Sequence, residues 1–181
     1  MTQQILHCHP DSSCSSVHTL SCDVLALNNG DVQLNYYLAG DLNNLLLPKP
    51  IASRQADKLW EHSCFEAFIG VVGEQAYHEY NFSPSKQWAA YCFCDYREIM
   101  AWKVSDSPKI ECLQQDKSLT MSVTLAKEIL PPNPQNKPLN MGLSTVIETK
   151  SGELSYWALK HASEQPDFHH RDSFIHQLKT S

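Results

Sequence analysis

The segment Cys64–Phe82 reads CFEAFIGVVGEQAYHEYNF and carries the clearest sign of the fold. The runs 64–72 and 75–82 read as two strands on either side of Gly73-Glu74, a pair that favours a two-residue turn between antiparallel strands. Counting back from that turn places Phe65 opposite Phe82, on a face that is otherwise aliphatic and aromatic. This segment is therefore predicted to be a β-hairpin with one face in the core.

A period of two, with apolar residues at every second position, runs through residues 32–38, 119–125 and 139–147. Turn residues separate such segments along the chain, and we expect about eight or nine short strands. Helical turns are expected only in residues 53–62 and 125–130. The pattern predicts an all-β chain, folded as an antiparallel β-sandwich of the immunoglobulin-like or jelly-roll kind.

The length of 181 residues suits one domain with its own core. We expect a single ligand-binding domain over residues 16–181 and a loosely ordered segment over residues 1–15. The oligomeric state is left open by the sequence.

Composition argues against several classes of partner. The formal net charge is −6, and 14 lysines and arginines are scattered along the chain, so no basic face for nucleic acid is expected. No apolar run reaches the roughly 18–20 residues of a membrane span. The first ten residues lack the basic and apolar regions of a signal peptide, so we expect a cytoplasmic protein whose seven cysteines are reduced.

The second face of the predicted hairpin carries Glu66, Glu79 and Asn81. A four-residue loop over 83–86 would align Trp88 with Asn81 in one row across three strands. A carboxylate, an amide and an indole in line can bind a sugar, because the indole covers the apolar face of the ring while the others bond its hydroxyls. A slip of one residue would instead send Trp88 into the core, and both carboxylates could simply face solvent.

A second group of candidates lies near the carboxy terminus. His161 follows a predicted strand, and the segment 166–172 reads PDFHHRD, which includes His169 and Arg171. These side chains could bind a ligand or could lock the loop to the sheet. A metal site built from His161, His169, His170 and an aspartate is an alternative.

Catalytic motifs for nucleophilic, phosphate-loop or zinc chemistry are absent from the sequence. Glu66 and Glu79 could form a glycosidase pair, but a shallow sandwich face excludes water poorly. We therefore expect a binding protein and not an enzyme. Docking of another protein on an exposed edge strand is a further alternative.

Three stretches carry a resemblance to a known group of proteins: 59–68, LWEHSCFEAF; 77–91, YHEYNFSPSKQWAAY; and 155–171, SYWALKH followed by PDFHHR. Together they resemble the bacterial DOMON-like domain proteins, which are similar to family 9 carbohydrate-binding modules and to haem- and sugar-binding DOMON domains. The resemblance spans nearly the whole chain and implies a β-sandwich with a ligand site on one sheet.

Family 9 modules clamp a terminal sugar between two tryptophans, so the resemblance points to Trp60 or Trp157 with Trp88. Haem-binding members use an axial methionine and histidine, which makes a haem site an alternative here. The expected ligand is a small polar molecule, most simply a sugar, with no cofactor. The candidate binding residues are Trp60, His62, Glu66, Glu79, Asn81, Trp88, Trp157, His161, His169 and Arg171.

Overall fold

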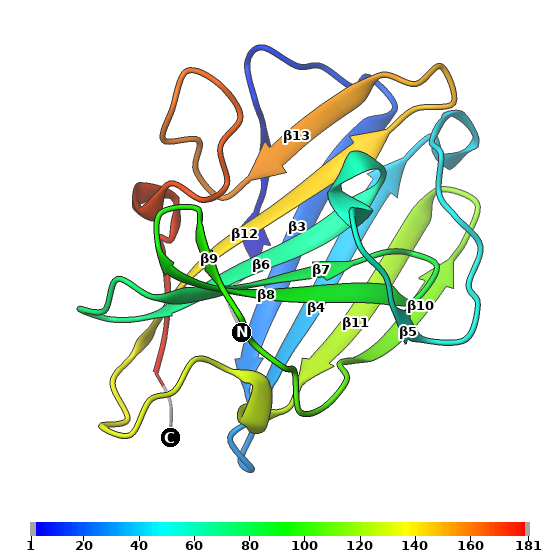
Figure 1. The fold of residues 1–181 in the computed structure, drawn as a ribbon. Coiled ribbons are helices and arrows are strands. Elements are labelled where there is room, and N and C mark those ends of the chain that lie inside the picture. Colours follow the sequence, from blue (N-terminus) through cyan, green and yellow to red (C-terminus); the bar gives the residue numbers. More distant parts are fainter. Residues whose placement is uncertain (1–2, 180–181) are drawn as a thin grey trace.

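The computed structural model describes residues 3–179, which form two β-sheets packed face to face (Figure 1). The five-stranded sheet, called sheet A, is antiparallel throughout. Its strands, in spatial order, are β1 (Gln4–Ile5), β3 (Val17–Ala26), β4 (Val32–Gly40), β11 (Ser118–Leu125) and β10 (Lys109–Gln114).

The larger sheet, called sheet B, is antiparallel except where β5 joins β8. Its main order is β2 (His7–Cys8), β13 (Leu154–Ala158), β12 (Leu139–Glu148), β6 (Cys64–Val71), β7 (Tyr77–Phe82), β8 (Gln87–Asp95) and β5 (Arg54–Gln55). Two further strands pair at its margins, β14 (His176–Leu178) with β12 and β9 (Glu98–Met100) with β8.

Helical structure is confined to four single turns: η1 (Leu42–Asn44), η2 (Leu59–Glu61), η3 (Lys127–Ile129) and η4 (Arg171–Ser173). The predicted all-β sandwich is confirmed, and η2 and η3 lie within the two segments expected to form helical turns. No helix in residues 3–179 is long and apolar enough to cross a membrane.

The core fills the space between the sheets. Alternate residues of β4 (Val32, Leu34, Tyr36 and Leu38) point inward and are almost completely buried. From sheet B, Phe65, Ala67, Ile69, Tyr80 and Phe82 meet them, as the hairpin pattern predicts. Burial of this continuous apolar layer is the main favourable contribution to folding, at about 25 cal/mol per Å².

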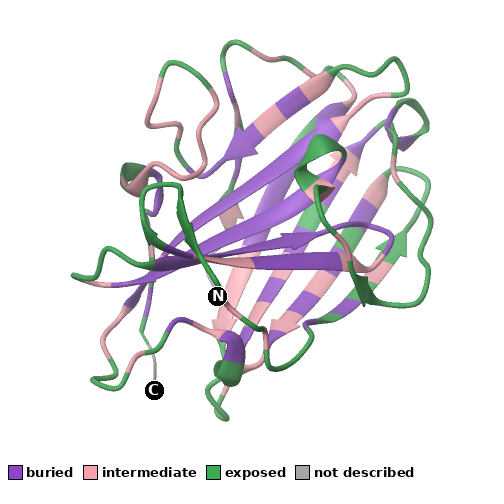
Figure 2. Ribbon diagram, viewed as in Figure 1, coloured by how far each residue is buried: buried purple, intermediate pink, exposed green. Residues whose placement is uncertain are grey.

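Sheet B is unusual because both of its faces are buried near the centre. Every residue of β6 and β7 is buried, whereas β4 and β11 in sheet A have partly or fully exposed residues between the buried ones (Figure 2). In an antiparallel sheet with one face packed on a core, the other face is usually exposed to solvent. Other segments of the chain must therefore cover the outer face of sheet B, which is the face directed away from sheet A.

The β6–β7 register agrees with the prediction, since Glu66 pairs with Asn81. The chain reverses at Val71–Glu74, where Gly73 has φ of +84° and the Glu74 N–H donates to the Val71 carbonyl oxygen at 3.0 Å. Glycine adopts this left-handed conformation without a steric penalty.

The predicted β7–β8 register is wrong by one residue. Phe82 pairs with Trp88, and Asn81 pairs with Ala89. The connection is a three-residue loop between Ser83 and Gln87, whose closing bond runs from the Ser83 N–H to the Gln87 carbonyl at 2.9 Å. Lys86 takes the left-handed position of this loop, with φ of +70°.

The segment expected to be loosely ordered contains two short strands in its described part. Gln4–Ile5 pairs with β3 of sheet A, and His7–Cys8 pairs with β13 of sheet B. Leu6, between them, is buried in the core and donates its backbone N–H to Leu20. This segment therefore crosses from one sheet to the other.

Candidate ligand-binding site

The outer face of sheet B is built from side chains that alternate with the core residues of β6, β7 and β8. Glu66 and Phe68 come from β6, Glu79 from β7, and Tyr91 and Phe93 from β8. The strand register puts Phe68, Glu79 and Tyr91 side by side in one row across the three strands. Glu66 lies in the next row on the same face, where it is paired with Asn81. These residues form a floor in which two carboxyl groups are set among aromatic rings.

Three segments from elsewhere in the chain rise around this floor. They are η2, the turn between β8 and β9, and the loop that follows β13; Figure 1 shows the last two side by side. Together they enclose a cavity of about 490 Å³, which we call the outer-face pocket. Its lining residues are Trp60, Glu66, Phe68, Glu79, Tyr91, Phe93, Arg97, Ile99, Val146, Tyr156, Pro166, Phe168 and His169.

Two neighbouring side chains, Asn81 and His169, contact the carboxyl group of Glu79. Asn81, two residues along the same strand, donates its amide N–H to Glu79 Oε1 at 2.7 Å. His169 Nε2 lies 3.6 Å from Glu79 Oε2. Burial raises the pKa of Glu79 to about 7, although the Asn81 hydrogen bond and the charge of Arg97 act in the opposite direction.

Glu66 is the more deeply buried carboxyl group. Its side chain is 2% exposed, and Oε1 has no hydrogen-bond partner among the described residues. Burial, followed by the nearby charge of Glu79, raises the pKa of Glu66 well above its usual range. Ser144 and Cys64 act the other way, but no hydrogen bond of ordinary geometry reaches Oε1. The floor thus contains a buried polar atom without a protein partner.

His169 is oriented by the phenol of Tyr77. The Tyr77 hydroxyl accepts the backbone N–H of Arg97 at 3.1 Å and lies 2.8 Å from His169 Nδ1. Donation from that hydroxyl to Nδ1 leaves the second ring nitrogen, Nε2, to carry its proton toward Glu79. Burial and the Arg97 charge lower the pKa of His169 to about 4, so the ring is neutral at pH 7.

Arg97 joins the two walls of the pocket. Its guanidinium donates to Asp167 Oδ1 at 2.9 Å, and the neighbouring Tyr96 hydroxyl donates to Asp167 Oδ2 at 2.8 Å. These contacts tie the β8–β9 turn to the loop that carries His169. They also place the positive charge of Arg97 against the negative charge of Asp167.

The aromatic rings surround the entrance as well as the floor. Trp60 is 40% exposed and meets Tyr91 edge to face, with 5.8 Å between ring centroids. On the other side of the entrance, the ring centroids of Phe168 and Tyr156 are 6.2 Å apart. Rings in such positions can stack on the apolar face of a bound molecule while their edges stay packed on the protein.

Four of the residues predicted from the sequence line the pocket: Trp60, Glu66, Glu79 and His169. Asn81 does not reach the cavity but supports Glu79 from the sheet. These five come from η2, β6, β7 and the loop after β13, so the structure brings together candidates more than 100 positions apart in the sequence.

Two predicted tryptophans face the core. The one-residue difference in register turns Trp88 inward, where it is 7% exposed, so the proposed row of Glu66, Asn81 and Trp88 does not form. Trp157 pairs with Thr145 on the inner side of sheet B and donates its indole N–H to Ser155 Oγ at 3.0 Å. Neither indole lines the outer-face pocket, and the tryptophan clamp implied by the resemblance is not formed by these residues.

The remaining predicted residues contact other parts of the protein. His62 bonds Glu148 Oε2 at 2.7 Å, and His161 bonds the carbonyl oxygen of His7 at 2.8 Å. The guanidinium of Arg171 donates to the Glu74 carbonyl oxygen at 3.0 Å and lies over the rings of Tyr77 and Phe174. In the segment 166–172, His169 therefore faces the pocket while Arg171 braces the loop.

The histidines of the alternative metal site make separate contacts. Within residues 3–179 no group of three histidine, cysteine, aspartate or glutamate side chains is arranged to hold a metal ion. His161, His169 and His170 each have different neighbours, and His170 caps η4 by accepting the Asp172 N–H.

Sequence reasoning missed the aromatic lining contributed by Tyr91, Phe93, Tyr156 and Phe168, and it missed Arg97. Tyr91 and Phe93 could have been found, because the correct β7–β8 register places Tyr91 directly opposite Glu79. No local pattern marks Arg97 or Phe168, since both are positioned by contacts between distant loops.

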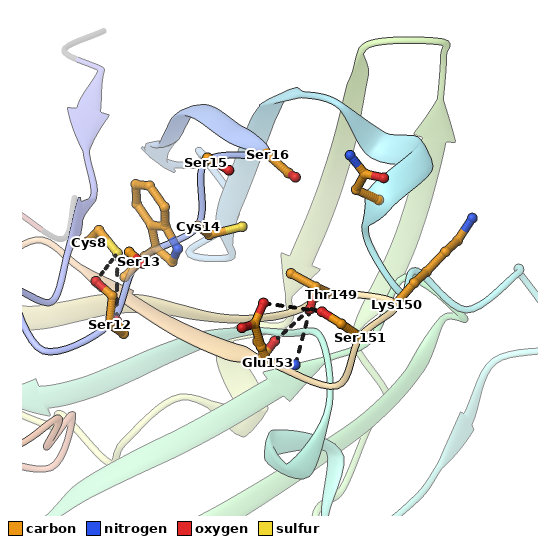
Figure 3. Close-up of a pocket in the computed structure, with 12 residues that line it drawn as sticks. Cys8, Ser12, Ser13, Cys14, Ser15, Ser16, Thr149, Lys150, Ser151 and Glu153 are labelled. Carbon is orange, nitrogen blue, oxygen red and sulfur yellow. Dashed lines mark hydrogen bonds between the residues drawn. The ribbon is translucent and has the colours of Figure 1, made fainter.

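A second cavity, of about 680 Å³, lies at the edge of the sandwich between residues 12–16 and the 149–153 turn (Figure 3). It is rich in hydroxyl groups, and one pair of them is bonded, with Thr149 Oγ1 2.8 Å from Ser151 Oγ. Thr149 Oγ1 also accepts the Glu153 N–H at 3.1 Å. On the opposite side, Cys8 Sγ donates to the Ser12 carbonyl oxygen. This cavity lacks the unpartnered buried carboxyl group that distinguishes the outer-face pocket.

Comparison with known proteins supports the fold. A crystal structure from Bacteroides uniformis, described as a "putative carbohydrate-binding protein", is similar with a TM-score of 0.65. The match covers 97% of this chain and 84% of that chain, at 14% sequence identity. No protein-family model and no curated protein sequence matches the chain. At this identity the likeness establishes a shared β-sandwich fold.

Proposed function

We propose that this protein binds a carbohydrate in the outer-face pocket, without catalysing a reaction on it. The observation that carries the proposal is the combination of two buried carboxyl groups, Glu66 and Glu79, with a rim of aromatic rings in one cavity. Sugars present both apolar C–H faces and a dense set of hydroxyl groups. The rings suit the first and the carboxyl oxygens the second.

The size of the cavity agrees with this class of ligand. A volume of about 490 Å³ lies within the roughly 300–1,000 Å³ typical of small-molecule sites. The Bacteroides uniformis structure, with its described carbohydrate-binding character, supports the same class by analogy of fold.

The unpartnered Oε1 of Glu66 gives the ligand a specific role. A buried oxygen without a partner costs roughly 1–3 kcal/mol, and a ligand hydroxyl that donates to it recovers this cost. Three or four such bonds with one stacked ring imply a dissociation constant between roughly 10 µM and 10 mM after the cost of association.

The test is isothermal titration calorimetry of the full chain against mono- and disaccharides. Trp60→Ala removes a ring at the entrance and should weaken binding about tenfold while leaving the unfolding midpoint nearly unchanged. Tyr37→Ala is the matched control, because Tyr37 is an aromatic residue of similar exposure, 39%, on sheet A. Absence of binding across the panel, or equal weakening by both substitutions, would refute the proposal.

A further inference from the structure

The charges around the floor of the outer-face pocket do not balance. Within residues 3–179, no lysine or arginine forms an ion pair with Glu66 or Glu79. Arg97, the one strongly basic residue among those that line the cavity, has its guanidinium against Asp167. The nearest basic ring is that of His169, whose Nε2 lies 3.6 Å from Glu79 Oε2. Its Nδ1 accepts a hydrogen bond from the Tyr77 hydroxyl, and burial lowers its pKa to about 4, so the ring is uncharged.

This arrangement is costly for the protein unless a cation arrives. Removing a carboxylate from water without an opposite charge beside it costs several kcal/mol, so below about pH 7 the free protein holds protons on both groups. A neutral sugar supplies hydroxyl donors but no charge. A positively charged group on the ligand would supply both hydrogen-bond donors and the missing charge.

The aromatic rim favours the same kind of ligand. Trp60, Tyr91, Phe93 and Phe168 border the carboxyl groups, and the negative face of an aromatic ring attracts a cation within about 6 Å. Acidic groups at the base of an aromatic enclosure are therefore suited to an ammonium group. An N-acetylated amine is neutral and would leave both carboxyl groups protonated.

We propose that the outer-face pocket selects a hexosamine with a free, protonated amine over the neutral parent hexose, with Glu66 and Glu79 receiving the ammonium group. This inference rests on the proposed carbohydrate-binding function and names the substrate class within it. Binding replaces the carboxyl proton with the ligand cation, so one carboxyl O–H bond is broken and the proton leaves to the solvent.

The pH dependence follows from the groups that face Glu79. They are Cys64 and Glu66 on β6, Tyr77 on β7, Tyr91 on β8, Arg97 on the β8–β9 turn, and His169 on the loop after β13. Between pH 5 and pH 6.5, the ionised fraction of a carboxyl group with a pKa of about 7 rises about twenty-fold. Hexosamine affinity should rise in the same sense by tenfold or more, because the amine stays protonated over this range.

The experiment titrates the full chain with glucosamine, galactosamine and mannosamine, each beside its parent hexose and its N-acetyl form. Calorimetry in two buffers of different ionisation enthalpy measures proton release. We expect one hexosamine to bind at least tenfold more tightly than its parent at pH 6.5, with net proton release. Equal or tighter binding of the parent hexose, or no proton release, would overturn the inference while leaving carbohydrate binding intact.

If no sugar of any kind binds, the proposed function fails, and this inference fails with it. Glu79→Gln should abolish the preference for the amine, measured as the ratio of the dissociation constants of the hexosamine and its parent hexose. Glu111→Gln, which makes the same change on an exposed residue of β10, is the matched control and should keep the preference. Because the proton-release measurement uses the unaltered protein, the inference can be tested even if a variant fails to fold.

Discussion

The substitution Glu79→Gln should make the protein more stable at alkaline pH, although it removes a residue of the binding site. Glutamine has nearly the same shape as glutamate, and its carbonyl oxygen can accept the Asn81 hydrogen bond that Glu79 Oε1 accepts at 2.7 Å. The side chain of Glu79 is only 8% exposed, so its charge is poorly solvated. The difference between the two proteins is therefore the cost of ionising one buried carboxyl group.

The size of the expected difference in free energy of unfolding follows from the pKa of Glu79. Burial raises the pKa of Glu79 from the ordinary value of 4.5 to about 7, and each pH unit is worth about 1.4 kcal/mol. Because the folded-state pKa is raised, protonation stabilises the native protein fully below about pH 4.5, and this contribution is lost as the pH rises through about 7. Glu79→Gln should match the unaltered protein at pH 4.5 and exceed it by about 3 kcal/mol at pH 8.

The assay is urea unfolding at pH 4.5, 6 and 8, followed by tryptophan fluorescence. The free energy of unfolding is compared between the variant and the unaltered protein at each pH. Glu111→Gln, on an exposed site, should change stability little at any of the three values. A stability difference for Glu79→Gln that stays constant from pH 4.5 to pH 8 would show that Glu79 ionises as readily in the fold as in water.

Three further substitutions test other parts of the structure. Trp88→Ala should cost about 3–5 kcal/mol in a urea titration, because the indole is in the core; a cost below about 1 kcal/mol would contradict that placement. Burial lowers the pKa of His169 to about 4, so between pH 6.5 and pH 4 the free energy of unfolding of His169→Gln should rise by about 3 kcal/mol relative to that of the unaltered protein; a constant difference in urea titrations would contradict the lowered pKa. A Cβ on Gly70 would lie 2.3 Å from the Arg171 guanidinium, so Gly70→Ala should displace that side chain and speed amide hydrogen exchange in residues 168–174. Unchanged exchange there would show that Arg171 does not brace the loop.

The sequence predicts the central hairpin well because its information is local. In Cys64–Val71 and Tyr77–Phe82 the core-facing positions are mostly apolar, the alternate positions include Glu66, Glu79 and Asn81, and Gly73 marks the turn. These features decide both the register and the face on which Glu66 and Glu79 lie. The carboxylate floor of the pocket was thus predictable from one stretch of chain.

The next turn could not be predicted in the same way. A three-residue loop of this type needs a left-handed residue at its last position, which is most often glycine. Here the position is occupied by Lys86, with φ of +70°, so the usual signal is missing. The predicted loop is one residue longer than the real one, which puts Trp88 on the wrong face of the sheet. The same difference leaves Tyr91 out of the predicted site.

The segments that surround the floor of the pocket were less predictable still, because contacts between residues far apart in the sequence position them. The Arg97–Asp167 ion pair joins residues 70 positions apart, and the Tyr77–His169 hydrogen bond joins residues 92 apart. The composition of segment 166–172 indicated a polar role but did not distinguish His169, which faces the pocket, from Arg171, which braces the loop.

The loop that carries His169 also links the pocket to the acidity of the solution. It lies over the floor of the pocket, and burial there raises the pKa of both Glu66 and Glu79. Near neutral pH, folding therefore takes up protons at these two groups and unfolding releases them. A change in buffer acidity is then felt by the pocket and by the folded state together.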